Sequence, residues 1–317
     1  MAWLDKHNLM ILNEFILVGI TDLPELQAPL FGLFLIVYMV SVGYNLGLII
    51  LTMIDSRLHT PLCFFLIHLA FTDLGYSTAV GPKMLVNLAI DQHTVSYHWC
   101  ATQLSFFSRF ITSEIFILSA MAYDRYVAIF NPLLYTSIMS QRLCHTLVAI
   151  PYLYSLFLSL LTIIKIFISS FCGHDVIKHF CDNLPLISLL CSDTREIKWI
   201  ILIFSIFNLV SSLLIVLVSY ILILVTIFRM NSAERRHKAF STSGSHLTVT
   251  VIFYGILFFM YMQPKSSDSF DIDKMTSLFY TLLIRMLRNG KGTPTPVLLP
   301  GKSYGWESLV GCSPRGR

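Results

Sequence analysis

Six long stretches of the chain are apolar and almost free of charge, and each is long enough to cross a lipid bilayer as a helix. They cover residues 29–54, 61–90, 101–129, 143–171, 199–228 and 239–262. A bilayer core about 30 Å thick needs about 20 apolar residues in helical form. The pattern therefore predicts six membrane helices joined by short loops within one membrane domain.

A seventh apolar stretch is much shorter. Only residues 275–284 are uncharged before Arg285 and Arg288. Ten helical residues rise about 15 Å, which is half a bilayer, and each Arg near a helix centre costs about 2.5–3.5 kcal/mol. The predicted fold class is an all-α integral membrane protein, a seven-transmembrane helix bundle whose seventh helix is truncated or disrupted.

The end of the chain differs sharply in composition from the rest. Residues 285–317 contain six Gly, four Pro and six Lys or Arg against one Glu, a mixture that does not sustain a helix. We therefore expect three parts: an extracellular N-terminus at 1–28, a seven-transmembrane domain at 29–284, and a disordered basic tail at 285–317.

Composition narrows the function classes. Hydrophobic residues make up 55% of the 317 residues and charged ones only 13%, so lipid is the solvent for most of the chain. The net charge is +4, and no basic patch interleaved with aromatics points to nucleic acid. The sequence has no phosphate loop, metal-spaced His/Cys cluster or nucleophile elbow, so neither an enzyme nor a cofactor is predicted.

Basic residues in the loops predict the orientation. Arg57, Arg142 and the basic cluster at 229–238 fall on one side of the membrane, whereas the loop at 91–99 has no Lys or Arg. Cytosolic loops are enriched in Lys and Arg. The N-terminus is therefore expected outside.

An acidic and a basic residue stand side by side near the end of the third predicted helix. Asp124 and Arg125 lie within the sequence MAYDRYVAI, residues 121–129. Ionisable residues at membrane depth usually serve a function. The simpler interpretation is an interfacial pair that only marks the helix end.

MAYDRYVAI resembles the third-helix signature of odorant receptors, a branch of the rhodopsin-like G-protein-coupled receptors. Further patterns of that family occur in the expected order: EFILVG (14–19), PELQ (24–27), GYN (43–45), LHTP (58–61), LAFTD (69–73), PKML (82–85), SY (219–220), KAFST (238–242) and SHL (245–247). Each pattern alone is weak, but the combination is specific. The resemblance spans roughly residues 13–284.

The resemblance implies that one end of the bundle binds a heterotrimeric G protein of the stimulatory olfactory type, which raises cyclic AMP. In the family, the Arg of this motif is held by its neighbouring Asp at rest and enters the G-protein cleft on activation. The residues that match cleft positions are Asp124, Arg125, Tyr126, Tyr220, Lys238 and His246. Simple anchoring at the membrane surface is an alternative for Lys238.

Two carboxylates, Asp73 and Glu114, fall near the middle of the membrane. They must share a proton, bind a cation or face water. The resemblance favours a sodium-type polar site that includes Asn45. The alternative is that one carboxyl is simply protonated and hydrogen-bonded.

Four cysteines are candidates for disulfides at the outer end. By resemblance, Cys100 pairs with Cys181, and Cys172 then pairs with Cys191. Spacing alone leaves all three connectivities of four cysteines open. Because the disulfide claims Cys181, no metal site is predicted around it.

Side chains at helical spacing in the outer halves of the third, fifth and sixth helices match the odorant-contacting region of the family. They are Phe107, Ser108, Ile111, Thr112, Phe204, Ser205, Asn208, Tyr254, Leu257, Phe258 and Tyr261. This mixture suits a small, mostly hydrophobic volatile held by one or two hydrogen bonds. Without the resemblance, helix packing would be the better interpretation of each residue.

The resemblance ends at Ile284. The family continues its seventh helix through an Asn-Pro-x-x-Tyr switch, whereas here Arg285 stands where Pro is expected and Arg288 where Asn is expected. The leading hypothesis is an odorant receptor of the plasma membrane. The alternatives are a non-signalling product of a degenerate receptor gene, retained in the endoplasmic reticulum, and a transporter or channel, which predicts broken helices or internal repeats.

Overall fold

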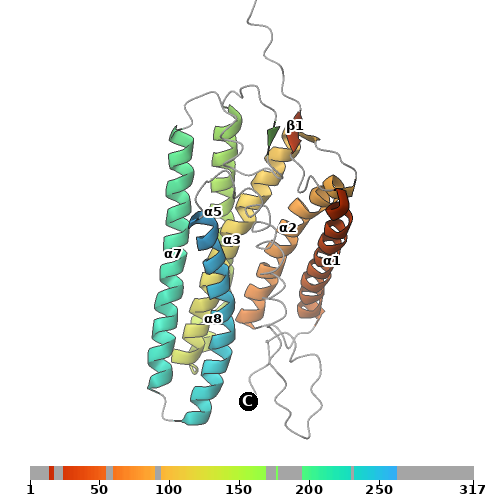
Figure 1. The fold of residues 1–317 in the computed structure, drawn as a ribbon. Helices are drawn as coiled ribbons and strands as arrows, with labels where there is room; N and C mark the ends of the chain where they lie inside the picture. Colours follow the sequence, from red (N-terminus) through yellow and green to blue (C-terminus); the bar gives the residue numbers. More distant parts are fainter. Residues whose placement is uncertain are drawn as a thin grey trace, which may run out of the picture.

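The computed structural model describes residues 14–17, 24–54, 60–89, 94–168, 176–177, 195–229 and 232–262. The long helices in this part of the chain are α1 (Pro24–Ile54), α2 (Pro61–Ala89), α3 (Tyr97–Phe130), α5 (Gln141–Ile168), α7 (Arg195–Phe228) and α8 (Ala233–Met262) (Figure 1). Each corresponds to one of the six predicted stretches. The predicted stretch at 275–284 and the tail at 285–317 lie outside the described residues.

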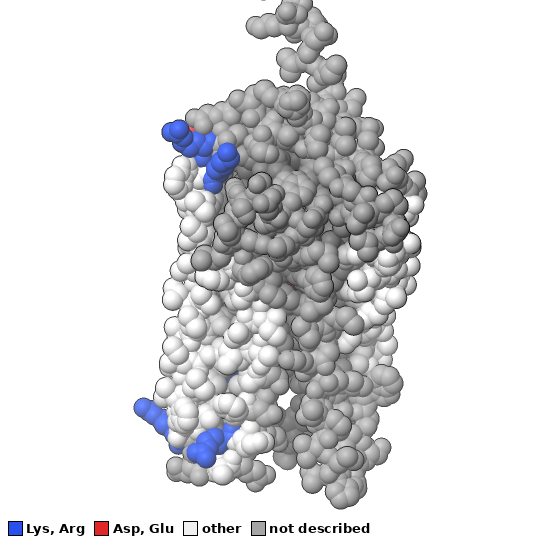
Figure 2. All heavy atoms as spheres, in the orientation of Figure 1, with Lys and Arg blue, Asp and Glu red and all other residues white. Residues whose placement is uncertain are grey.

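The described helices have the length and composition of membrane spans. Five of them, α1, α2, α3, α5 and α7, are apolar enough over a sufficient length to cross a bilayer, and α8 contains a shorter apolar run, His246–Gly255. On α7, side chains such as Val218 and Ile221 are more than half exposed, as expected where lipid is the solvent. Figure 2 shows Lys and Arg at the two ends of one face of the molecule, with uncharged atoms between them.

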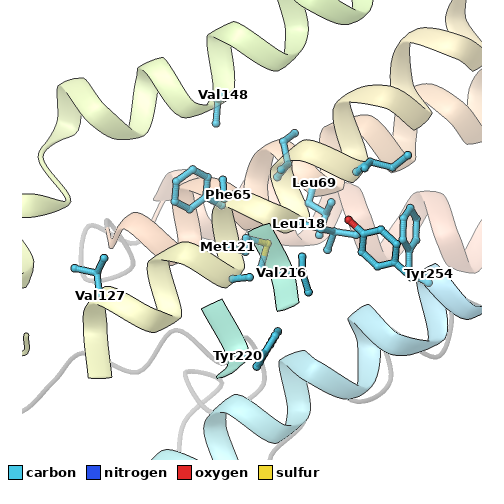
Figure 3. Packing of buried hydrophobic residues seen from close by; sticks show 14 of the residues in the cluster. Phe65, Leu69, Leu118, Met121, Val127, Val148, Val216, Tyr220 and Tyr254 are labelled. Carbon is cyan, nitrogen blue, oxygen red and sulfur yellow. The ribbon is translucent and has the colours of Figure 1, made fainter. Parts of the chain in front are cut away.

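Helix α3 is central to the bundle, because it packs against α2, α5, α7 and α8. Its buried side chains, among them Leu118 and Met121, meet Phe65 from α2, Tyr220 from α7 and Tyr254 from α8 (Figure 3). A movement of α7 or α8 therefore changes side-chain contacts with α3 directly.

A small three-stranded sheet closes one end of the bundle, which we call the sheet end. Strand β1 (Glu14–Leu17) lies in the middle, antiparallel to β2 (Thr94–Ser96) and parallel to β3 (Val176–Ile177). Ser96 also caps α3, since its hydroxyl accepts a hydrogen bond from the Trp99 backbone N–H at 3.3 Å. The sheet thus ties the start of α3 to a segment about 80 residues earlier in the sequence.

Two glycines on α2 allow close packing of aromatic rings. A Cβ atom at Gly75 would lie 2.2 Å from the Phe110 ring of α3, and one at Gly81 would lie 2.6 Å from the Tyr38 ring of α1. Both distances are far below van der Waals contact. The approach of α2 to its two neighbours therefore depends on the missing side chains.

We expect Gly75→Ala to reduce the amount of folded receptor severalfold, because overpacking a close-packed interior costs about 1–3 kcal/mol. Phe110 is only 6% exposed and has little space to move. The matched control is Gly47→Ala on α1, where nothing lies within 4 Å of the added atom. Surface immunostaining of the two variants measures the difference, and equal levels would contradict this account of the α2–α3 contact.

Candidate functional site

The Asp-Arg pair of α3 forms an ion pair at the end of the bundle opposite the sheet. Arg125 Nη2 lies 2.9 Å from Asp124 Oδ2. The Asp124 side chain is fully buried, whereas that of Arg125 is 16% exposed. An unpaired buried carboxylate would be costly, so Arg125 stabilises Asp124 in its charged form.

A tyrosine from the segment after α3 donates a hydrogen bond to the other oxygen of this carboxylate. The hydroxyl of Tyr135, on the short helix α4 (Tyr135–Ile138), donates a hydrogen bond of 2.7 Å to Asp124 Oδ1. Burial first, and then the Asp124 charge, raise the pKa of the Tyr135 phenol above its ordinary value. Tyr135 therefore stays protonated and acts as a donor, and both oxygens of Asp124 are engaged.

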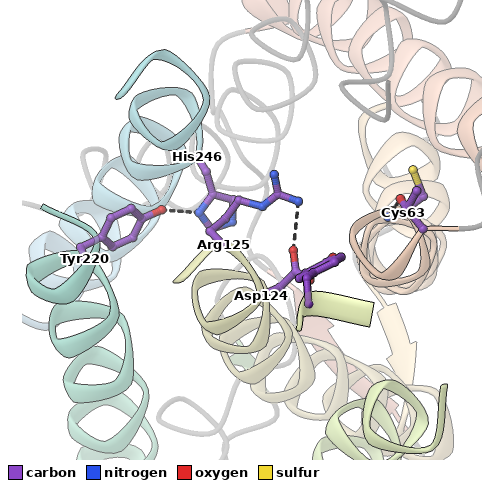
Figure 4. Close-up of polar contacts among 7 residues, drawn as sticks. Cys63, Asp124, Arg125, Tyr220 and His246 are labelled. Atoms are coloured by element: carbon purple, nitrogen blue, oxygen red, sulfur yellow. Dashed lines mark hydrogen bonds and ion pairs between the residues drawn. The ribbon is translucent and has the colours of Figure 1, made fainter. Parts of the chain in front are cut away.

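A second polar pair joins α7 to α8 beside Arg125. The Tyr220 hydroxyl and His246 Nδ1 form a short hydrogen bond, and their rings are stacked with centroids 6.1 Å apart. Figure 4 shows Arg125 between this pair and Asp124. Within the described part of the chain, Arg125 Nε and His246 Nε2 are buried without a hydrogen-bond partner. The three helices thus converge on one cation whose bonding is incomplete.

Of the residues predicted for the G-protein cleft, the structure therefore brings together Asp124, Arg125, Tyr220 and His246. Tyr126 turns aside and stacks on Phe130, with ring centroids 5.4 Å apart. Lys238 belongs to α8, but its side chain lies outside the described residues.

The predicted ligand residues of α3 lie nearer the sheet end and are partly enclosed. Phe107, Ser108, Ile111 and Thr112 are half-buried. The Phe107 ring meets that of Tyr76 on α2, with centroids 5.3 Å apart. Ile111 also packs against the central buried cluster, so this stripe of α3 leads from the sheet end into the core.

The predicted ligand residues of α7 and α8 divide into two groups. Phe204 and Ser205 are half-buried, and Asn208, Tyr254 and Leu257 are buried. The Asn208 Oδ1 accepts a hydrogen bond of 2.7 Å from the Tyr154 hydroxyl of α5. Phe258 does not share this face, since it is 58% exposed. The Tyr261 side chain lies outside the described residues.

A cluster of hydroxyls below this region was missed in the sequence. Ser119 of α3 and Ser212 of α7 are almost fully buried, and the Ser119 hydroxyl reaches the Ser212 carbonyl at 3.3 Å. The buried Tyr254 hydroxyl lies beside both of these serines. Ser119 is seven residues, about two turns, beyond Thr112 on the same face of the helix, so extending the predicted stripe by two turns would have found it.

The predicted ion-site residues are all buried in the bundle. Asn45, Asp73 and Glu114 are at most 3% exposed. Ser41 of α1 and Ser77 of α2 meet with their hydroxyl oxygens 3.5 Å apart. Because α1 and α2 are neighbours that run in opposite directions, one turn further along each helix Asn45 and Asp73 come to the same level.

The comparison with protein families is decisive. The family model described as "Olfactory receptor" matches residues 34–286, which is most of the chain. The chain belongs to the olfactory receptor family.

Individual relatives agree with this assignment. Human olfactory receptor 8K3 is 67% identical over 285 residues, which cover 90% of this chain and 91% of that protein. Human olfactory receptor 8K5 is 62% identical over 283 residues, covering 89% and 92% respectively. The crystal structure of squid rhodopsin superimposes with a TM-score of 0.67 at 16% identity, over 87% of this chain and 79% of that one. The fold is therefore the seven-helix receptor fold, and the protein is a multi-pass membrane receptor.

One of the four predicted disulfide cysteines of this olfactory receptor falls in the described chain. Cys100, in the first turn of α3, is fully buried and disulfide-bonded. Cys172, Cys181 and Cys191 lie outside the described residues, so the pairing stays a prediction. Cys144 of α5 is buried and carries a free thiol.

Proposed function

We propose that this olfactory receptor binds a small hydrophobic volatile among α3, α7 and α8 and activates a heterotrimeric G protein at the Arg125 end. The convergence of Asp124, Tyr135, Tyr220 and His246 around Arg125 carries the proposal. The three helices that would hold the ligand are the same three that meet around this arginine. Ligand and G protein therefore act on one connected element.

The contacts support a mechanism in which ligand binding changes the position of α8 relative to α3. At the ligand level, Tyr254 and Leu257 of α8 pack into the cluster that contains Ile115 of α3. A tilt of α8 there displaces His246 at the other end and breaks its bond to Tyr220. Arg125, which already lacks one hydrogen-bond partner, is then free to leave Asp124 for the G protein.

The chemistry of the proposed ligand region favours a molecule with one polar group. Its lining combines the aliphatic Ile111 and Leu257 with the buried hydroxyl of Tyr254, which lies beside Ser119 and Ser212. These hydroxyls offer a ligand oxygen a hydrogen bond within an otherwise apolar region. We propose that volatile alcohols, aldehydes and ketones activate the receptor better than hydrocarbons of the same shape.

We also propose the finer features that the family resemblance implies. The sheet end faces outside in the plasma membrane, because Arg142, Arg229 and Arg236 lie at the opposite end of the bundle. At the sheet end, the 91–99 connection has no Lys or Arg, and basic residues stand at the end of α5 and the start of α7. The G protein is the stimulatory olfactory type. A sodium ion binds among Asn45, Asp73 and Glu114, since all three are buried and carboxyl and amide oxygens are ligands that a hard cation takes.

The test is a cyclic AMP assay in cells that express the full chain with a stimulatory olfactory G protein. Matched panels of straight-chain alcohols, aldehydes, ketones and alkanes are applied, and surface immunostaining is recorded on the same cells. A response to polar members that alkanes do not evoke supports the proposal. Surface receptor with no response to any panel counts against it, and a chain held in the endoplasmic reticulum would instead favour the degenerate-gene hypothesis.

Tyr135→Phe is expected to raise basal cyclic AMP by roughly tenfold at equal surface level, because one hydrogen bond to a charged group contributes about 1.5–3 kcal/mol. The change removes the hydroxyl that Asp124 accepts from and leaves the ring in place. The control is Tyr123→Phe on α3, whose hydroxyl makes no contact with Asp124 in the described structure. Unchanged basal activity in Tyr135→Phe would show that this bond does not hold the resting state.

A further inference from the structure

A charged residue in the membrane part of α3 has no role in the mechanism above. Arg109 is half-buried, and its Nε is fully buried without a hydrogen-bond partner in the described chain. Two residues along a helix turn about 200°, so the ligand-stripe residues Phe107 and Ile111 point to the opposite side of α3. Ser108 and Thr112 lie about 100° and 60° from Arg109, at the edge of the stripe. Arg109 therefore points away from the centre of the proposed odorant region.

Contacts on either side of Arg109 locate it at the seam between α3 and α5. Ser105, one turn earlier, meets Ser159 with hydroxyl oxygens 2.9 Å apart, and Ser113, one turn later, meets Ser155 at 2.8 Å. Residues four apart share a helix face. Arg109 thus stands between two serine pairs that hold α3 against α5.

A chain of aromatic ring contacts from three helices runs next to this position. Phe110 of α3 stacks on Phe106 at 5.8 Å and meets Phe71 of α2 at 6.2 Å, and Phe71 in turn meets Tyr152 of α5 at 6.4 Å between centroids. Arg109 interacts electrostatically with Tyr152. Phe71 and Phe106 are 51% and 42% exposed, so these two rings face the membrane.

The charge of Arg109 needs an anionic partner. The described chain contains no ion pair to Arg109, and a cation in this position costs several kcal/mol without one. Fifteen residues separate Arg109 from Asp124, or about 22 Å along the helix. With Asp124 at one face of a core about 30 Å thick, Arg109 lies about 8 Å short of the other face.

The direction of the side chain brings its charge closer to that face. A helical side chain leans towards the helix N-terminus, and the N-terminus of α3 is at the sheet end. A guanidinium on its long stem therefore approaches the phosphate layer of that leaflet. A phosphate is also the anion that matches the planar fork of Arg.

We propose that Arg109 and the neighbouring rings of Phe71, Phe106, Phe110 and Tyr152 form a binding site for a phospholipid of the leaflet at the sheet end. Its phosphate contacts the Arg109 guanidinium, and an acyl chain lies over the exposed rings of Phe71 and Phe106. This lipid seals the junction of α2, α3 and α5 on the side away from the odorant region. The site is independent of any ligand or G protein.

The experiment uses the purified full chain in detergent, with thermal stability measured as lipid is added. The probes are dioleoylphosphatidylcholine, dioleoylglycerol, which has the same chains and no phosphate, and inorganic phosphate alone. We expect the wild-type chain to gain more stability from phosphatidylcholine than from dioleoylglycerol, and nothing from inorganic phosphate. Equal gains from the two lipids, or the full gain from inorganic phosphate, would overturn the proposal without any variant.

The second part of the experiment uses the Arg109→Gln variant. This substitution should weaken the apparent affinity for phosphatidylcholine by roughly tenfold, about the effect of one charge-assisted hydrogen bond. It should leave the effect of dioleoylglycerol on thermal stability unchanged. The control is Lys198→Gln, an exposed cation at the sheet end of α7. If Arg109→Gln keeps the wild-type preference for phosphatidylcholine, or if Lys198→Gln loses it equally, Arg109 is not the phosphate ligand.

Discussion

An Arg125→Ala receptor is expected to reach the cell surface and bind its odorant but to give no cyclic AMP response. Arg125 is the cation on which α3, α7 and α8 converge, and it is the only member of that cluster with a long, partly exposed positive side chain in the described chain. Alanine leaves nothing that can donate to carbonyl or carboxylate groups of a G protein. The signal should fall to the level of cells without receptor.

The fold should survive this change. Removing one partner of a fully buried ion pair costs about 3–5 kcal/mol, but Arg125 is partly exposed at the end of the bundle, which screens the pair and lowers that cost. Asp124 also keeps the hydrogen bond from Tyr135.

Three measurements separate signalling from folding: surface immunostaining, odorant-induced thermal stabilisation of the purified receptor, and cyclic AMP. The matched control is Arg142→Ala, which removes an exposed arginine from the same end of the bundle. Arg125→Lys keeps the charge but loses the planar fork, and should retain a weak response. A full response from Arg125→Ala at normal surface level would remove this arginine from the G-protein site.

Much of the fold could be predicted because lipid imposes a simple rule on sequence. A helix that crosses a bilayer must be apolar over about 20 residues, and six such stretches are helices in the structure. The rule says nothing of parts outside the membrane. Helix α8 begins at Ala233, six residues before its predicted stretch, because charged side chains such as Glu234 and Arg236 are good helix formers in water.

The sheet and the short helix α4 escaped prediction for a different reason. Strand β1 has four residues and pairs with Val95, about 80 residues away, so no local period reveals it. The same holds for the bond between Tyr135 and Asp124, which needs the chain to turn back after α3. Tertiary contacts between short segments are absent from any hydropathy pattern.

In the candidate site, helical spacing predicted the burial of some α8 residues but not of others. Tyr254 and Leu257 lie three residues apart and are both buried, as the spacing requires. Phe258 lies four residues after Tyr254 and so fits the same helical spacing, but it is exposed, because α8 buries only a narrow strip against α3 and α7. The family resemblance identified Tyr220 and His246 as members of one cleft, whereas their hydrogen bond to each other emerged only from the packing of α7 on α8.

Cys100→Ser is expected to abolish surface delivery almost completely. Cys100 is fully buried and disulfide-bonded within the first turn of α3, next to strand β2, through which α3 is tied to β1. Loss of a native disulfide costs about 2–5 kcal/mol, a large part of the stability of a typical domain. The start of the central helix would lose its covalent anchor, and the loop that carries the partner cysteine would be released with it.

The control for this variant is Cys144→Ser, which makes the same chemical change at a buried thiol that forms no disulfide and should reach the surface. If the partner of Cys100 is Cys181, as the family resemblance implies, then Cys181→Ser should fail equally, and the double variant should be no worse than either single one. A double variant that is clearly worse would mean that the two cysteines belong to different bridges. Normal delivery of Cys100→Ser would mean that the three-stranded sheet alone holds α3 in place, and that the disulfide is dispensable for the fold.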